Sequence, residues 1–186
     1  KVRLHIHEHE PAEALALLAA DGVDLALTYD YNLVPAAHDR AGSARPLWTT
    51  AWALGVPRTS PKATGDAPAV FDRFRDTDWI VNSRNAADEH AIRTVASMAG
   101  FEPRITHQAD SLALVQDLIV AGFGVGLLPA DQPTVPGVRL LPLRNPALRL
   151  RAYAVVRRGR TTWPPLALVL DLLTAGTTAQ STVETS

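Results

Sequence analysis

Apolar residues along the chain follow two spacings in turn, one typical of strands and the other typical of helices. Short apolar runs that suit strands alternate with stretches in which apolar residues recur every three or four positions, as on one face of a helix. This order predicts an α/β fold with parallel strand pairing. The predicted strands cover residues 2–6, 23–28, 47–56, 79–81, 105–108, 125–128, 138–143 and 148–157, and the predicted helices cover residues 11–20, 71–74, 86–99, 112–119 and 164–174.

The clearest helix–strand unit lies in residues 110–130. Asp110 or Ser111 can cap its helix, Gly122 suits the left-handed position that ends a helix, and the strand that follows is almost wholly apolar, as in a buried parallel strand. The alternating glycines of residues 122–126 resemble a phosphate-binding loop, but such a loop lies between a strand and a following helix. Here the glycines follow the helix, where backbone carbonyls repel phosphate. The pattern therefore indicates packing.

Two proline-containing connectors, residues 59–68 and 131–137, separate the predicted elements into blocks. Two connectors around a central αβ block predict two lobes with two crossings between them, and small ligands usually bind in the cleft of such a layout. The predicted lobe I comprises residues 1–56 and 132–176, lobe II comprises residues 57–131, and a disordered tail comprises residues 177–186.

Composition and charge exclude several classes of protein. The 186 residues include 18 basic and 19 acidic side chains, so the net charge of −1 gives no electrostatic attraction for nucleic acid. The short basic cluster of residues 157–160 can meet DNA phosphates, but a solvated turn is the more common role. The absence of cysteine excludes disulfides and thiolate metal sites. No apolar run reaches membrane-spanning length and no signal peptide opens the chain, which predicts a cytoplasmic protein.

Three histidines mark the first predicted strand. His5, His7 and His9 fall on one face of it, and two histidines at this spacing can chelate zinc when a third ligand comes from elsewhere. No Asp or Cys cluster accompanies them, so a solvent-facing edge strand is the favoured interpretation. We therefore predict neither a metal nor a cofactor.

Several segments in the same order resemble the effector-binding domain of LysR-type transcriptional regulators. Residues 115–130 (VQDLIVAGFGVGLLPA) resemble its glycine-containing signature, and residues 15–29 (LALLAADGVDLALTY) resemble its companion segment. Residues 46–57 and 155–173 extend the resemblance to nearly the whole chain. The resemblance implies a two-lobed, type 2 periplasmic-binding-protein-like fold, in which each lobe is a Rossmann-like sheet flanked by helices. It also implies a small effector bound between the lobes and pairing with a second copy.

The resemblance departs from the family pattern at the start of the chain. Members of the family carry an N-terminal helix-turn-helix and a linker helix, and their effector domain opens with one more strand and helix than the segment that begins at Lys1. The resemblance therefore implies that this strand–helix unit of lobe I is missing here. It also implies that DNA is bound only through a helix-turn-helix that this chain lacks.

Residue chemistry and the resemblance together point to three places for effector contacts. A polar run follows the strand that ends at Val81, where the N–H groups of a helix start favour an anion and Arg84 can bind a carboxylate through two hydrogen bonds. The other two places are the end of the first strand and the strand that enters the first connector. Two alternatives remain. The polar residues before the helix can serve only to cap it, and the hydroxyls on the strand that enters the first connector can be bonded within an ordinary strand. The predicted effector-binding residues are Asn82, Ser83, Arg84, Asn85, His9, Glu10, Thr49 and Thr50.

Three classes of function fit this pattern. We predict a ligand-sensing regulatory domain of a LysR-type regulator that binds a small carboxylate effector. The alternative is a solute-binding protein of a transport system, and an enzyme on the same fold is less favoured because no nucleophile is paired with a base. The helix of residues 11–20 is rich in alanine and leucine on nearly all sides, which predicts a homodimer or a tetramer.

Overall fold

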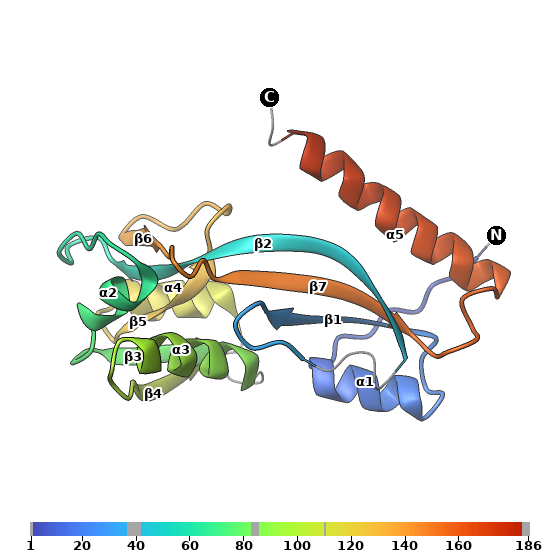
Figure 1. Cartoon of the computed structure of the whole chain (residues 1–186), viewed down its shortest axis with the longest axis horizontal. Helices are drawn as coiled ribbons and strands as arrows, with labels where there is room; N and C mark the ends of the chain where they lie inside the picture. Colours follow the sequence, from blue (N-terminus) through green and yellow to red (C-terminus); the bar gives the residue numbers. More distant parts are fainter. Residues whose placement is uncertain (1, 37–41, 83–85, 110, 184–186) are drawn as a thin grey trace. The chain divides into compact units, whose positions relative to one another are not determined.

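The computed structural model describes residues 2–36, 42–82, 86–109 and 111–183 of the chain. The chain forms two compact units (Figure 1), and β1, β2 and β7 contribute residues to both. The first unit comprises Lys1–Asp30, Ala36–Thr49 and Arg151–Ser186, and the second comprises Tyr31–Pro35 and Thr50–Leu150. The elements are α1 Pro11–Ala19, β1 Leu25–Tyr31, β2 Ser43–Pro57, α2 Ala67–Asp72, β3 Asp78–Asn82, α3 Ala86–Met98, β4 Arg104–Ala109, α4 Leu112–Val120, β5 Val125–Pro129, β6 Val138–Pro142, β7 Arg149–Val156 and α5 Pro164–Val183.

The two units follow the internal packing of the chain, and their bounds differ from those of the predicted lobes, which divide near residues 57 and 132. The predicted lobes are the two sides of a ligand cleft, and they stay a prediction.

The first predicted strand is wrong, because residues 2–10 form no strand. Alternating apolar residues make a strand only where a sheet neighbour accepts the hydrogen bonds and one face is buried. Neither face of this segment is buried, since residues 2–9 are all exposed and Ile6 has 87% of its surface in contact with solvent. The histidines of this segment therefore do not share the face of a strand.

The second unit holds a mixed sheet with strand order β2–β5–β3–β4, and β6 pairs with β2. The predicted parallel pairing is found for β3 with β4 and for β3 with β5. It fails for β2, which runs antiparallel to both β5 and β6. Because β5 and β6 are both antiparallel to β2, they run in the same direction as each other, and the irregular backbone of residues 130–137 joins them without a helix.

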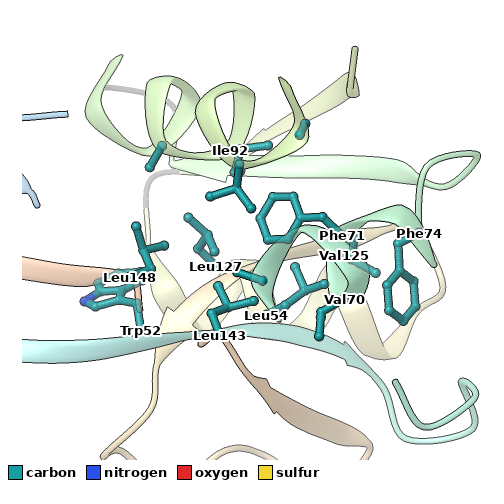
Figure 2. Close-up of a cluster of buried hydrophobic side chains, with 14 of the residues drawn as sticks. Trp52, Leu54, Val70, Phe71, Phe74, Ile92, Val125, Leu127, Leu143 and Leu148 are labelled. Carbon is teal, nitrogen blue, oxygen red and sulfur yellow. The ribbon is translucent and has the colours of Figure 1, made fainter. Parts of the chain in front are cut away.

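Helices cover both faces of this sheet, as the alternation of side chains along β3 shows. Trp79 and Val81 belong to a large cluster that includes residues of α2 and α3. Ile80 points the other way, into a second cluster with residues of α4. Figure 2 shows the larger cluster, in which side chains of α2, α3 and β5 meet above the strands. The second unit is therefore a three-layer αβα arrangement.

The glycines after α4 serve packing. Gly122 has a φ of +82° and ends the helix as predicted, while the Ser111 hydroxyl accepts a hydrogen bond of 3.2 Å from a backbone N–H of the first turn. A Cβ atom at Gly124 would overlap the carbonyl oxygen of Asp78, and one at Gly126 would lie 2.9 Å from the carbonyl oxygen of Ile80. The backbone of this segment therefore lies against β3 too closely for a side chain.

The first unit contains a sheet in the order β1–β7–β2, with one helix on each face. Val155 of β7 packs with Leu18 of α1, whereas its neighbours Ala154 and Val156 pack with α5. Successive residues of a strand point to opposite faces, so α1 and α5 cover opposite faces of this sheet (Figure 1). The helix α5 runs on to Val183, past the predicted end at residue 174 and into the segment for which the sequence predicts disorder.

Candidate functional site

The candidate site lies at the edge of the second unit where its parallel strands end. Asn82, the last residue of β3, is paired in register with Ala109, the last residue of β4. Because β5 is also parallel to β3, all three strands end toward the same edge of the sheet. The chain leaves this edge from β3 into α3 and from β4 into α4.

The two connections leave toward opposite faces of the sheet. Residues of α3 pack on the face that holds Trp79, and residues of α4 pack on the face that holds Ile80. Open α/β sheets bind ligands at the switch point where the strand order reverses, and here it reverses between β3 and β5, because β4 lies on one side of β3 and β5 on the other. The start of α3, which follows β3, adds backbone N–H groups there.

The predicted polar run begins at this switch point. Asn82 is half-buried at the end of β3, whereas Ser83, Arg84 and Asn85 lie outside the described residues. On the neighbouring strand, Asp110 also lies outside them, and Ser111 caps α4. Asn82 therefore lies at the carboxyl edge of the sheet, and the role of the polar run as an effector site stays a prediction.

Sequence reasoning missed a buried polar pair at the start of α3. The Tyr31 hydroxyl donates a hydrogen bond of 2.6 Å to Oδ1 of Asp88, and both side chains are buried. The Tyr31 ring packs edge-on against Trp52, with 5.5 Å between the ring centroids. An Asp in the first turn of a helix and a Tyr at a strand end are common everywhere, so nothing in the sequence marked them as partners.

The first turn of α3 carries two carboxylates. Asp88 is held by Tyr31, and the Glu89 carboxylate accepts a hydrogen bond of 2.8 Å from Nε of Arg93. An anionic ligand at this helix start would therefore meet negative charge as well as N–H donors. Arg84 stays the predicted source of positive charge for a carboxylate ligand.

The other predicted contact residues are divided between the two units. His9 and Glu10 precede α1 in the first unit, where Nδ1 of His9 lies 3.7 Å from the Glu13 carboxylate. The strand β2 passes from the first unit to the second between Thr49, which is exposed, and Thr50, which is half-buried. Their roles as effector contacts stay predictions.

The ion pair at the other end of β3 and β4 does not belong to the site. Asp78 begins β3 and Arg104 begins β4, and Nε of Arg104 lies 2.5 Å from the Asp78 carboxylate. The hydrogen bond from Arg104 lowers the pKa of Asp78. Within the part of the chain that the structure describes, no group of three His, Cys, Asp or Glu side chains is arranged to hold a metal ion.

Comparison with known proteins identifies the family. The chain matches the LysR substrate binding domain over residues 1–178. It belongs to the LysR substrate-binding domain family. No curated protein matches this LysR domain at a significant level.

Solved structures of related proteins have the same fold. The effector-binding domain of QuiR in complex with shikimate has a TM-score of 0.73 at 14% identity, and the match covers 92% of this chain and 79% of that one. The reduced form of OxyR has a TM-score of 0.69 at 19% identity, with 92% and 79% covered. An OxyR mutant from Corynebacterium glutamicum has a TM-score of 0.68 at 19% identity, with 96% of this chain but only 56% of that chain covered.

These findings confirm the predicted family and the predicted periplasmic-binding-protein-like fold of type 2. They place the LysR domain among ligand-sensing regulatory domains of transcriptional regulators, which are not enzymes, and they do not favour a transport protein. Among the helices of the described residues, none has the length and apolar character that crossing a membrane requires.

Proposed function

We propose that this LysR domain senses a small carboxylate effector at the carboxyl edge of β3 and β4. The observation that carries the proposal is the switch point, where Asn82 ends β3 and the strand order reverses between β3 and β5. The family supports the class of function, and the switch point supports the position of the effector site.

Polar groups around the edge define the chemistry of the proposed effector. Asn82 to Asn85 offer amide, hydroxyl and guanidinium donors at the start of α3, and Arg84 is the proposed carboxylate partner. His9, Glu10, Thr49 and Thr50 are proposed as further contacts. Because Asp88 and Glu89 repel a second negative charge, the proposed effector carries few carboxylates and also donates hydrogen bonds.

The proposed partners follow from the family. QuiR was solved with shikimate, and full-length CbnR was solved with its target DNA. We propose that this LysR domain acts in the cytoplasm as the regulatory part of a longer protein that binds DNA through a helix-turn-helix. Effector binding would then shift the population of two arrangements of the protein, which requires different affinities for the two.

The effector proposal is tested by a thermal-shift screen of small carboxylates, shikimate included, followed by titration of the variants Arg84→Ala and Asn82→Ala. We expect at least tenfold weaker binding for Arg84→Ala, because a bidentate charged contact is lost. The matched control is Arg73→Ala, which removes an exposed arginine just after α2. Equal affinity of the Arg84→Ala variant and the control would rule out the carboxylate clamp.

Self-association is proposed as well. The outward face of α1 exposes alanines to solvent, and only Leu18 of this helix is fully buried. A helix with so few polar residues is typical of one that packs against another chain. Sedimentation velocity at tens of micromolar, a range in which weak dimers form, should show a dimer or a tetramer. A monomer over this range would contradict the proposal.

A further inference from the structure

The strand β1 passes from the first unit to the second between two buried residues whose side chains are bonded to different units. Asp30 is the last residue of the first unit, and Tyr31 is the first residue of the second. The Asp30 carboxylate accepts hydrogen bonds of 2.8 and 3.0 Å from Arg151 and one of 2.9 Å from the backbone N–H of Ala36. All three of these residues belong to the first unit.

Tyr31 and Asn32 make the corresponding contacts within the second unit. The Tyr31 ring lies against Trp52 of β2. The Asn32 side chain donates a hydrogen bond of 2.9 Å to the carbonyl of Ala147 and accepts one of 2.7 Å from the N–H of Arg149, the first residue of β7. The end of β1, the middle of β2 and the start of β7 are therefore joined at Tyr31 and Asn32.

The Tyr31 hydroxyl extends this junction to the proposed effector site. Asp88 lies in the first turn of α3, 57 positions away along the chain, and Tyr31 donates to it from a position with no exposed surface. A buried hydrogen bond to a carboxylate is costly to break without a replacement, because both groups are shielded from water. This bond therefore ties the first turn of α3 to the end of β1.

We propose that Tyr31 and Asp88 are positioning residues that couple the start of α3 to the point where β1 passes between the two units. This proposal rests on the proposed effector site at the start of α3. An effector that shifts this turn would displace the Tyr31 hydroxyl and with it the junction of β1, β2 and β7. The coupling would give the ligand site a direct connection to the strands that link the two units, as a change of population between two arrangements needs.

The coupling is tested by hydrogen exchange of the ligand-free chain, followed by mass spectrometry. Tyr31→Phe removes the donor and keeps the ring on Trp52, and Asp88→Ala removes the acceptor. We expect each variant to speed exchange about tenfold both in residues 29–33 and in the first turns of α3, as loss of a hydrogen bond to a charged group predicts. Amides of β5, at the centre of the sheet, should keep their rates.

Three comparisons separate coupling from a merely stabilising role. The double variant should exchange about as fast as Asp88→Ala alone, since the bond between the two side chains is already lost in that single variant. Asp88→Asn keeps an acceptor oxygen and should restore the rate at the end of β1. The control Tyr153→Phe, which removes a hydroxyl in the first unit, should leave α3 unchanged.

The proposal is overturned if Tyr31→Phe changes only the end of β1, or if β5 accelerates as much as the other two segments. Because no ligand is present, such a failure would leave the proposed effector site untouched. Conversely, a failed effector titration would remove the site and leave the measured coupling in place.

Discussion

Replacement of Gly124 by alanine tests whether the glycines after α4 serve packing or a ligand. Gly124 has a φ of +155°, and a Cβ atom there would overlap the backbone carbonyl of Asp78 in β3. Gly122, two residues earlier, has a φ of +82°, but a Cβ atom there would meet no atom within 4 Å. Comparison of alanine substitutions at Gly122 and Gly124 therefore separates the loss of stability that backbone strain causes from the loss that close contact with β3 causes.

The expected magnitudes follow from these two geometries. An alanine in the left-handed region costs about 1–2 kcal/mol, and this is the whole cost expected for Gly122→Ala. Overlap with a rigid backbone adds about 1–3 kcal/mol at Gly124, because β3 is held by strands on both sides and cannot withdraw. We therefore expect Gly124→Ala to lose about 2–5 kcal/mol, a large part of the roughly 5–15 kcal/mol that stabilises a typical domain.

Urea unfolding followed by circular dichroism measures both variants, and thermal unfolding should give a fall of about 4 °C for Gly122→Ala and about 10 °C for Gly124→Ala. The double variant should lose the sum of the two. If Gly124→Ala is as stable as Gly122→Ala, close packing against β3 is not the reason for the glycine. Loss of ligand binding without loss of stability would assign the glycine to a ligand instead.

Three further substitutions test the charges and a helix cap. Arg151→Ala should lose about 3 kcal/mol in urea unfolding, because Asp30 is only 2% exposed and would be left without this partner; a loss below about 1 kcal/mol would contradict this. Asp78→Asn should lower the melting temperature above about pH 4 and have no effect well below it, since Arg104 holds the folded pKa of Asp78 below its unfolded value of 3.8. A difference that persists in acid would be inconsistent with that pKa. Ser111→Ala should cost about 1 kcal/mol, and Ser111→Asp should restore the cap; equal stability of all three forms would show that the cap is unimportant.

Most of the fold could be predicted because its elements carry local signals. The helix–strand unit of residues 112–129 was found from apolar spacing, a cap and a glycine stop, and all of these act within a few residues. The segment of residues 2–6 has equally good alternation but no buried face. Alternation of apolar and polar residues shows only that a segment could bury one face as a strand. The segment forms a strand where a neighbouring strand accepts its hydrogen bonds and other residues cover that face.

For the candidate site, the position of Asn82 at a sheet edge was predictable from the sequence, but the contacts around it were not. Polar residues after a buried strand pointed to Asn82, because the ends of parallel strands gather at one edge. The pairing of β2 with β5 in the antiparallel sense, and the bond between Tyr31 and Asp88, join segments that are far apart in the sequence. No local pattern marks such partners, since they are selected by the topology of the whole sheet.

The most direct test of the proposed function is a nuclear magnetic resonance titration of the labelled chain with the carboxylate that gives the largest thermal shift. The account predicts that the largest changes in amide chemical shift fall in residues 82–88 and 109–112, on the two connections that leave the carboxyl edge of β3 and β4. Smaller changes at the end of β1 would follow from the bond between Tyr31 and Asp88. Changes confined to other parts of the chain, with both connections unaffected, would contradict the proposed effector site.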